Sequence, residues 1–288
     1  MAAVPQVARI RIKNILFPTD FSPASQAALP LALSLAHLYD AAIRVVHVLQ
    51  PEPLRQVTVD RIPLQDDRVW EDARSRLEWF THDPSMGKIP YKSLLASGDL
   101  GEVIPRLIQE HHVDMVVVGT HGRTGLSKLL IGSGAEKIYR SADCPVLTVG
   151  PGAHAADWKP RRILCPVDLQ GAPQAAVRYA SSLAQDSNSE FILMAAVPMV
   201  PWQHRAETEV ETCARLADLV PDGPVAQFLV RWEPPGEAIL RAAAHREAEL
   251  IVMGVRKSRA AGFSSHLPWP VASEVVSRAT CPVLTVRI

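Results

Sequence analysis

The sequence repeats itself once, and this repetition constrains the fold more than any other feature of the chain. Three segments recur in the same order: ILFPTD at 15–20 as ILCPVD at 163–168, DMVVVG at 114–119 as ELIVMG at 249–254, and CPVLTV at 144–149 as CPVLTV at 281–286. Such matches at nearly constant spacing indicate one duplicated unit of about 140 residues. We therefore expect two domains, 1–150 and 160–288, joined by a linker that begins at Gly150-Pro151-Gly152.

Each copy alternates predicted strands with predicted helices. The unbroken apolar runs at 115–118 and 251–253 are typical of strands that are covered on both faces. The alternation predicts an α/β fold with two tandem doubly wound parallel sheets, Rossmann-like in character. The expected strands are 15–18, 43–49, 91–96, 115–119, 146–149, 163–166, 191–197, 225–230, 250–254 and 283–286, and the expected helices are 23–38, 68–81, 100–110, 133–142, 173–185, 205–219, 235–246 and 271–279.

Ligands of doubly wound sheets bind beyond the carboxyl ends of the strands, where the strand order reverses. In the first copy these ends carry Pro18-Thr19-Asp20, His47-Val48 and Gly119-Thr120-His121-Gly122, and a loop then leads to Gly132-Ser133-Gly134. The glycines at 119 and 122 permit tight turns and close approach of the backbone to a ligand. We expect those at 132 and 134 to leave bare amides at a helix N-terminus, with the Ser133 hydroxyl beside them, which together make an anion site.

These residues carry a family resemblance that covers nearly the whole chain in two copies. The spacing Gly119, two residues, Gly122, nine residues, Gly132-Ser133, followed by the CPV strand, resembles the signature of the universal stress protein family. The resemblance implies an adenine-nucleotide-binding fold of the alpha-hydrolase-like class that binds ATP and often dimerises through its final strand. It also implies that Pro18, Thr19 and Asp20 flank adenine and ribose, that the Val48 backbone meets adenine, and that Gly119, Gly122, Gly132, Ser133 and Gly134 bind ribose and phosphates.

The second copy departs from this pattern. It keeps Pro166, Asp168, Val197 and Gly254, but Lys257 replaces the second signature glycine, and Trp269-Pro270 replaces the glycine-serine pair. Proline has no N–H, and an indole would crowd a phosphate. We expect the C-terminal copy not to bind ATP in the family manner and to act mainly as a structural partner. An alternative is that Arg256 and Lys257 hold another anion.

Plainer interpretations stay open for several of these residues. Asp20 could cap the following helix instead of binding ribose, and Gly119 and Gly122 could be turn residues only. His47 and His121 lie near the expected cleft but are more simply structural, and Arg123 and Lys128 could face solvent or phosphates. We expect Cys144 and Cys281, each followed by proline, to pack inside the protein.

Composition limits the partners. The 30 basic and 30 acidic side chains cancel, which argues against binding nucleic acid or a membrane through the overall field. No apolar stretch has the length of a signal peptide or a membrane span. Four cysteines without a CxxC pair suit a reducing compartment, so the cytoplasm is the expected location and no metal site is expected.

The first functional hypothesis is therefore an ATP-binding regulatory protein of the stress response. Whether Mg²⁺ accompanies the nucleotide stays open, although a triphosphate normally brings it. The final strands of the two copies would pair within the chain, and two chains could pair again as a homodimer. No catalytic residues are assigned, because no nucleophile, base and orienting group come together. Slow ATP hydrolysis or autophosphorylation stays open, with Ser133 and Thr120 as weak acceptor candidates. The rival hypotheses are a nucleotide-free protein-interaction scaffold and an ATP-dependent adenylating enzyme.

Overall fold

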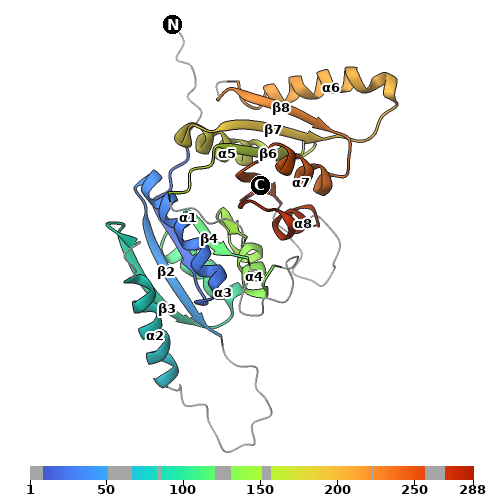
Figure 1. The fold of residues 1–288 in the computed structure, drawn as a ribbon. Helices are drawn as coiled ribbons and strands as arrows, with labels where there is room; N and C mark the ends of the chain where they lie inside the picture. The colour runs from blue at the N-terminus through green and yellow to red at the C-terminus, as the bar shows by residue number, and fades with distance from the viewer. Residues whose placement is uncertain are drawn as a thin grey trace, which may run out of the picture.

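The computed structural model describes residues 9–50, 67–82, 86–120, 131–150, 157–221, 224–256 and 270–288. Within them each repeat has the predicted alternation of strands and helices (Figure 1). The first repeat contains β1 (Asn14–Pro18), α1 (Pro23–Tyr39), β2 (Ala42–Leu49), α2 (Asp67–Thr81), β3 (Tyr91–Ser97), α3 (Leu100–Glu110), β4 (Met115–Gly119), α4 (Ser133–Ser141) and β5 (Val146–Val149). The second contains β6 (Arg162–Val167), α5 (Gln174–Ser187), β7 (Glu190–Ala196), α6 (Trp202–Ala217), β8 (Ala226–Arg231), α7 (Pro235–His245), β9 (Leu250–Val255), α8 (Pro270–Arg278) and β10 (Val283–Arg287).

All ten of these strands form one sheet in the order β3-β2-β1-β4-β5-β10-β9-β6-β7-β8. Within each repeat the neighbouring strands are parallel, and β5 and β10 join the two halves as the one antiparallel pair among the described strands. The strand order reverses direction at β1 and β4 in the first half and at β6 and β9 in the second, as in a doubly wound sheet. The predicted fold class is therefore confirmed, and the predicted pairing of the two final strands agrees with this register.

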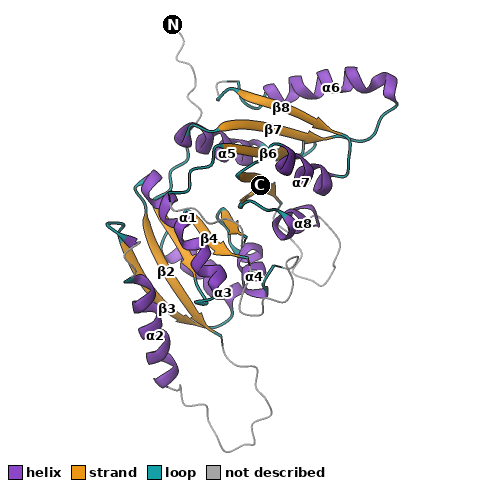
Figure 2. Cartoon of the chain, in the orientation of Figure 1, coloured by secondary structure: helices purple, strands orange, loops and turns teal. Residues whose placement is uncertain are grey.

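The helices cover both faces of the sheet, and Figure 2 shows strands enclosed between them. Successive strand residues alternate between faces: Ile15 and Phe17 pack under α1, whereas Leu16 packs on the opposite side under α3 and α4. On the first face, side chains of α1 and α5 belong to one apolar core that runs through both repeats. On the second face, α3 with α4 and α7 with α8 bury separate cores.

Polar contacts add to this shared core where the repeats meet. The Tyr39 hydroxyl donates to Asp186 Oδ2 at 2.9 Å, and the Trp158 amide donates to Ser34 Oγ at 2.8 Å. Burial and the hydrogen bond to Asp186 raise the pKa of Tyr39, so this phenol stays a neutral donor at physiological pH. The two repeats are thus packed as one body along α1 and α5.

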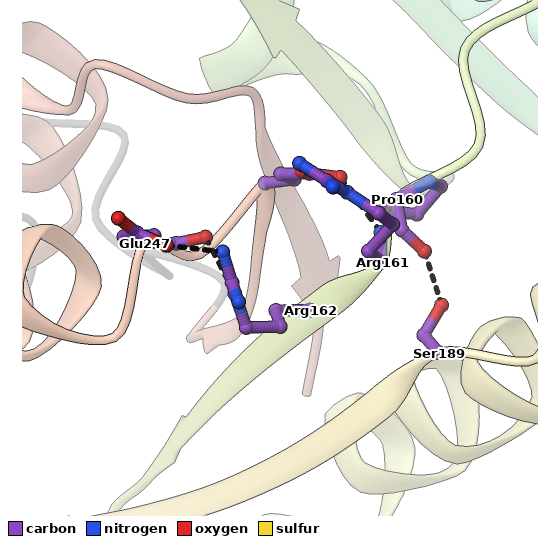
Figure 3. Close-up of polar contacts among 6 residues, drawn as sticks. Pro160, Arg161, Arg162, Ser189 and Glu247 are labelled. Carbon is purple, nitrogen blue, oxygen red and sulfur yellow. Dashed lines mark hydrogen bonds and ion pairs between the residues drawn. The ribbon is translucent and has the colours of Figure 1, made fainter.

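In both repeats, similar polar contacts hold the amino-terminal ends of the strands. These ends lie opposite the carboxyl ends, where ligands are expected. The Arg162 guanidinium donates to the Glu247 carboxylate at 2.5 Å and to its carbonyl at 3.1 Å, while Ser189 bonds Pro160 beside it (Figure 3). In the first repeat Asn14, at the place of Arg162, donates to the His112 carbonyl at 3.1 Å. His112 and Glu247 both adopt positive φ, 47° and 48°, just after α3 and α7. The duplication therefore extends to single turns and their polar contacts.

Candidate functional site

A cavity of about 430 Å³ opens at the carboxyl ends of β1, β2 and β4, where the strand order of the first repeat reverses. Eight of the nine predicted site residues line it: Pro18, Thr19, Asp20, Val48, Gly119, Gly132, Ser133 and Gly134. The ninth, Gly122, lies outside the described residues, as do His121, Arg123 and Lys128. Residues from four separate stretches of the chain thus meet in one hollow, whose volume lies within the usual range for small-molecule pockets.

The turn after β1 is held by short-range hydrogen bonds that present its side chains to the cavity. Thr19 is buried, and its hydroxyl lies 3.0 Å from the Ser25 hydroxyl. The Ser22 amide donates to Asp20 Oδ1 at 2.9 Å, and the Ser22 hydroxyl accepts from the Ser25 amide as the N-cap of α1. Ser22, and not Asp20, therefore caps α1. Asp20 instead closes the turn that places its half-buried carboxylate at the cavity.

An imidazole from β2 braces the same turn. His47 Nδ1 lies 2.7 Å from the Thr19 carbonyl oxygen, and the His47 ring lies 4.5 Å from the Phe21 ring, centroid to centroid. Phe21 has a φ of 61°, a rare conformation for a bulky side chain, and the Arg76 guanidinium lies 4.9 Å above its ring. These contacts support the simpler interpretation of His47, as a structural residue that shapes one wall of the cavity.

The opposite wall is the N-terminus of α4. Gly132 is its N-cap, and no side chain caps this helix. By helix geometry, the amides of the first turn have no partner one turn earlier within the helix, and Ser133, Gly134 and Ala135 of that turn line the cavity. The Gly132 amide itself donates to the Thr120 carbonyl at 2.5 Å. The expectation that this amide is bare was therefore wrong, because the carbonyl of Thr120, directly after β4, accepts from it.

Gly119 is glycine for a reason of packing. A Cβ at this position would lie 2.4 Å from the Ala24 carbonyl oxygen, so the backbone of α1 occupies the space that a side chain would need. Thr120, which follows, is buried and bonds Val149 through both its amide and its hydroxyl. These contacts hold the end of β4 against α1 and β5, and this positions the cavity floor.

Few ionisable groups line this cavity. Among its described lining residues they are Asp20 and His47, and no lysine or arginine is among them. Beyond the wall, Asp99 caps α3 by accepting from the Gly101 amide at 2.7 Å, and the Lys137 ammonium lies 2.6 Å from its other oxygen. Chiefly the hydrogen bond from Lys137, and then that from the Gly101 amide, lower the pKa of the Asp99 carboxyl. Among the described residues, an anion in the cavity would thus meet amides and the helix dipole before any basic side chain.

Sequence reasoning missed several residues that line the cavity: Ser22, Ser25, Val46, Leu49, Gln50, Leu100, Val118, Ala135 and Ile138. Ser25 carried a usable signal, because it lies one helical turn after the N-cap Ser22 on the first turn of α1. Leu100 and Ile138 carried none, since their position depends on how α3 packs against α4.

The second repeat has an equivalent arrangement with different contacts. Asp168, at the place of Asp20, accepts from Arg256 Nη2 at 3.2 Å. The predicted replacements Lys257 and Trp269 lie outside the described residues, as does the Pro270 side chain. In the part of the chain that is described, no group of three or more His, Cys, Asp or Glu side chains could hold a metal ion, and no helix is long and apolar enough to cross a membrane.

Comparison with known proteins gives the same two-part division. The model of the universal stress protein family matches residues 11–150 and again 159–287. A universal stress protein A homolog of Coxiella burnetii is 34% identical over 140 residues, which cover 48% of this chain and 95% of that protein. A universal stress protein of Mycolicibacterium smegmatis is 26% identical and covers 95% of this chain, with 97% of its own length matched.

Among solved structures, a universal stress protein from Archaeoglobus fulgidus superposes with a TM-score of 0.74 at 18% identity. That match covers 96% of this chain and 99% of the other. At this identity the likeness concerns the fold, and it extends over both repeats.

Proposed function

The chain belongs to the universal stress protein family, and from this premise we propose that it is an ATP-binding regulatory protein of the stress response whose N-terminal repeat holds the nucleotide. One observation carries the proposal: eight residues predicted for ATP from the sequence line a single cavity at the reversal point of the sheet. The C-terminal repeat serves mainly as the structural partner of that site.

The chemistry of the cavity suits a nucleotide. The first-turn amides of α4 and the Ser133 hydroxyl suit phosphate oxygens, and hydrogen bonds to charged oxygens contribute about 1.5–3 kcal/mol each. The dipole of α4 adds about 0.3–1 kcal/mol, so the placement of backbone donors governs phosphate binding. The Asp20 carboxylate is an acceptor for ribose hydroxyls, and the apolar Val48 and Leu100 side chains suit the face of a base.

Two measurements test the proposal on the full chain. Mass spectrometry of purified, then denatured protein should detect carried-over adenine nucleotide, and calorimetric titration with ATP, with and without Mg²⁺, should give one site per chain. Absence of binding at saturating ATP would leave the nucleotide-free scaffold as the better account. Two nucleotides per chain would contradict the assignment of the C-terminal repeat as structural.

Gly132→Val locates the site. The φ of −60° and ψ of 142° at Gly132 suit valine as well as glycine, so the fold should survive. The branched side chain would project at the N-terminus of α4, and we expect ATP affinity to fall by at least about tenfold, or 1.4 kcal/mol. Gly150→Val is the matched control: its new Cβ would meet nothing closer than the Ala279 carbonyl at 3.9 Å, and Gly150 does not line the cavity. Equal ATP affinity in the two variants would contradict the site.

A further inference from the structure

The second repeat has a cavity of its own, of about 460 Å³, at the carboxyl ends of β6, β7 and β9. It lies between α5, α7 and α8, at the place that corresponds to the proposed nucleotide cavity of the first repeat. The two hollows are thus nearly equal in size, and they differ in what lines them.

The described lining of the second cavity lacks the hydroxyl side chains that line the first. The duplicated segments and the strand registers Ile15↔Ile43 and Ile163↔Phe191 match positions between the two repeats. At matched positions Thr19 becomes Val167, Ser25 becomes Pro173 and Gly134 becomes Val271, while Val46 and Val48 become Met194 and Ala196. The sequence suggested that Val197 keeps the place of Val48; in this register Val197 matches Leu49, so that expectation was wrong. Hydroxyl groups and a bare glycine have given way to alkyl groups, so none of these described positions repeats the side-chain hydroxyls of the first cavity.

The charges that remain at this cavity neutralise each other. Asp168 and Arg256 are the ionisable side chains among its described lining residues, and they form an ion pair at 3.2 Å. Asp168 also accepts from the Gln170 amide at 2.9 Å. Because the Asp168 carboxylate is paired with a guanidinium, it is less available to ribose hydroxyls than an unpaired carboxylate would be. An anion drawn to Arg256 would also meet the Asp168 charge.

The floor of the cavity is apolar as well. Gly254 matches Gly119, but the space above it is bounded by the Ile288 side chain, whose atoms would lie 3.1 and 3.2 Å from a Cβ at Gly254. The Ile288 amide donates to the Val255 carbonyl at 3.1 Å and holds that side chain in place. An apolar hollow of this size forfeits dispersion contacts, which an apolar occupant would restore.

We propose that the C-terminal cavity binds an uncharged, largely apolar small molecule, so that the two repeats hold ligands of different chemical class. The site consists of the alkyl walls from β7, α7 and α8, with the Asp168–Arg256 pair at its rim. The proposal does not depend on ATP binding by the first repeat.

Fluorescence titration of the full chain with N-phenyl-1-naphthylamine, an uncharged aromatic probe, tests this site. We expect saturable binding of one probe per chain that saturating ATP does not displace. Ala196→Phe places a ring in the cavity from the half-buried end of β7, and we expect it to weaken probe binding at least about tenfold. Val271→Asp adds a carboxylate in the first turn of α8, where a helix tolerates an acid, and should weaken the probe by about as much.

Val48→Phe, at the place in the first repeat that matches Ala196, separates this proposal from the one above. Val48→Phe should retain probe affinity within about twofold and lose ATP binding, whereas Ala196→Phe should retain ATP affinity and lose probe binding. If Ala196→Phe does not fold, as judged by its thermal transition, Val271→Asp decides. The proposal would be overturned if the wild-type chain showed no saturable probe binding. It would also be overturned if Ala196→Phe and Val271→Asp both kept wild-type probe affinity, or if ATP displaced the probe.

Discussion

At the scale of single residues, the matched glycines of the two repeats separate packing from ligand binding. A Cβ at Gly119 would lie 2.4 Å from the backbone oxygen of Ala24, whereas one at Gly254 would meet side-chain atoms and no backbone, the nearest being two carbons of Ile288 at 3.1 and 3.2 Å. We therefore expect Gly119→Ala to lower the free energy of unfolding by about 1–3 kcal/mol, because backbone must move. Gly254→Ala, the matched control, should lose less than about 1 kcal/mol. Urea denaturation of both variants checks this, and equal losses would show that α1 yields more easily than its packing suggests.

Two thiols, the buried Cys144 and the half-buried Cys281, give a pH dependence of known sign. Burial raises the pKa of both Cys144 and Cys281 to about 12, whereas an unfolded thiol ionises near pH 8.5. Their stabilising contribution is fully present below about pH 8.5 and is lost as the pH rises toward the folded values, by about 1.4 kcal/mol per pH unit for each thiol. Urea denaturation at pH 8.5 and pH 10 should therefore show a smaller loss in the Cys144→Ala/Cys281→Ala variant than in the wild type. The control is Cys213→Ala, which removes a half-buried thiol of α6. It should alter the fall in the free energy of unfolding between pH 8.5 and pH 10 less than the double variant does.

At the scale of elements, the sequence predicted the order and kind of every strand and helix described, with most bounds within two residues of the observed ones. Strand–helix alternation and apolar runs are local signals, which a single sequence carries well. The start of α6 was placed too late, at Arg205 instead of Trp202, because Pro201 was not used as a start signal.

The candidate site was less fully predictable. The glycine spacing and the strand ends located eight lining residues, since the carboxyl ends of parallel strands must share one edge. The Thr120–Gly132 hydrogen bond and the approach of Ala24 to Gly119 could not be inferred. Both depend on how a loop and a helix pack in three dimensions, which no local pattern encodes.

The helix α4, which forms one wall of the proposed nucleotide cavity, is held at its other end by the second repeat. Arg287, at the end of β10, donates to the carbonyls of Ala142, Tyr139 and Arg140 at 2.7–2.9 Å, at the C-terminus of α4. A cation at this end also complements the helix dipole. The matching position in the first repeat is Gly150, so α8 receives no equivalent side chain from there. The second repeat thus holds α4 of the first repeat without an equivalent contact in return. This agrees with the proposal that the second repeat supports the site of the first.

Arg287→Met should therefore destabilise the chain. Methionine retains length and apolar contact but leaves the α4 carbonyls without these donors, and we expect a loss of about 2–3 kcal/mol in urea denaturation. Arg287→Lys keeps the charge but not the planar guanidinium, so its free energy of unfolding should lie between those of the wild type and Arg287→Met. A methionine variant as stable as the wild type would mean that water replaces the guanidinium at no cost.

At the scale of the whole molecule, the chain is built as a pseudo-symmetric pair. The strands β5 and β10 pair antiparallel with Leu147 opposite Leu284, and the hydroxyls of Thr148 and Thr285 donate across the junction to Val283 and Val146 at 3.0 and 3.2 Å. The two CPVLTV segments are identical in sequence, so each makes the contacts of the other. The junction already has the form of a symmetric dimer interface, with one repeat standing for a second subunit.

The first repeat without the second should therefore pair with itself. In a fragment of residues 1–150, β5 becomes an open edge strand, and the core that α1 shares with α5 is uncovered. A second copy of the fragment would present the same strand and the same helix, so we expect a dimer in sedimentation equilibrium, while Thr148→Glu, which places carboxylates in the buried junction, should prevent dimerisation. A wild-type fragment that is folded and monomeric at micromolar concentration would contradict this, because it would show that neither the β5 edge nor the exposed core needs a partner. A dimer would instead indicate that the duplication joined, in one chain, two units that could already assemble.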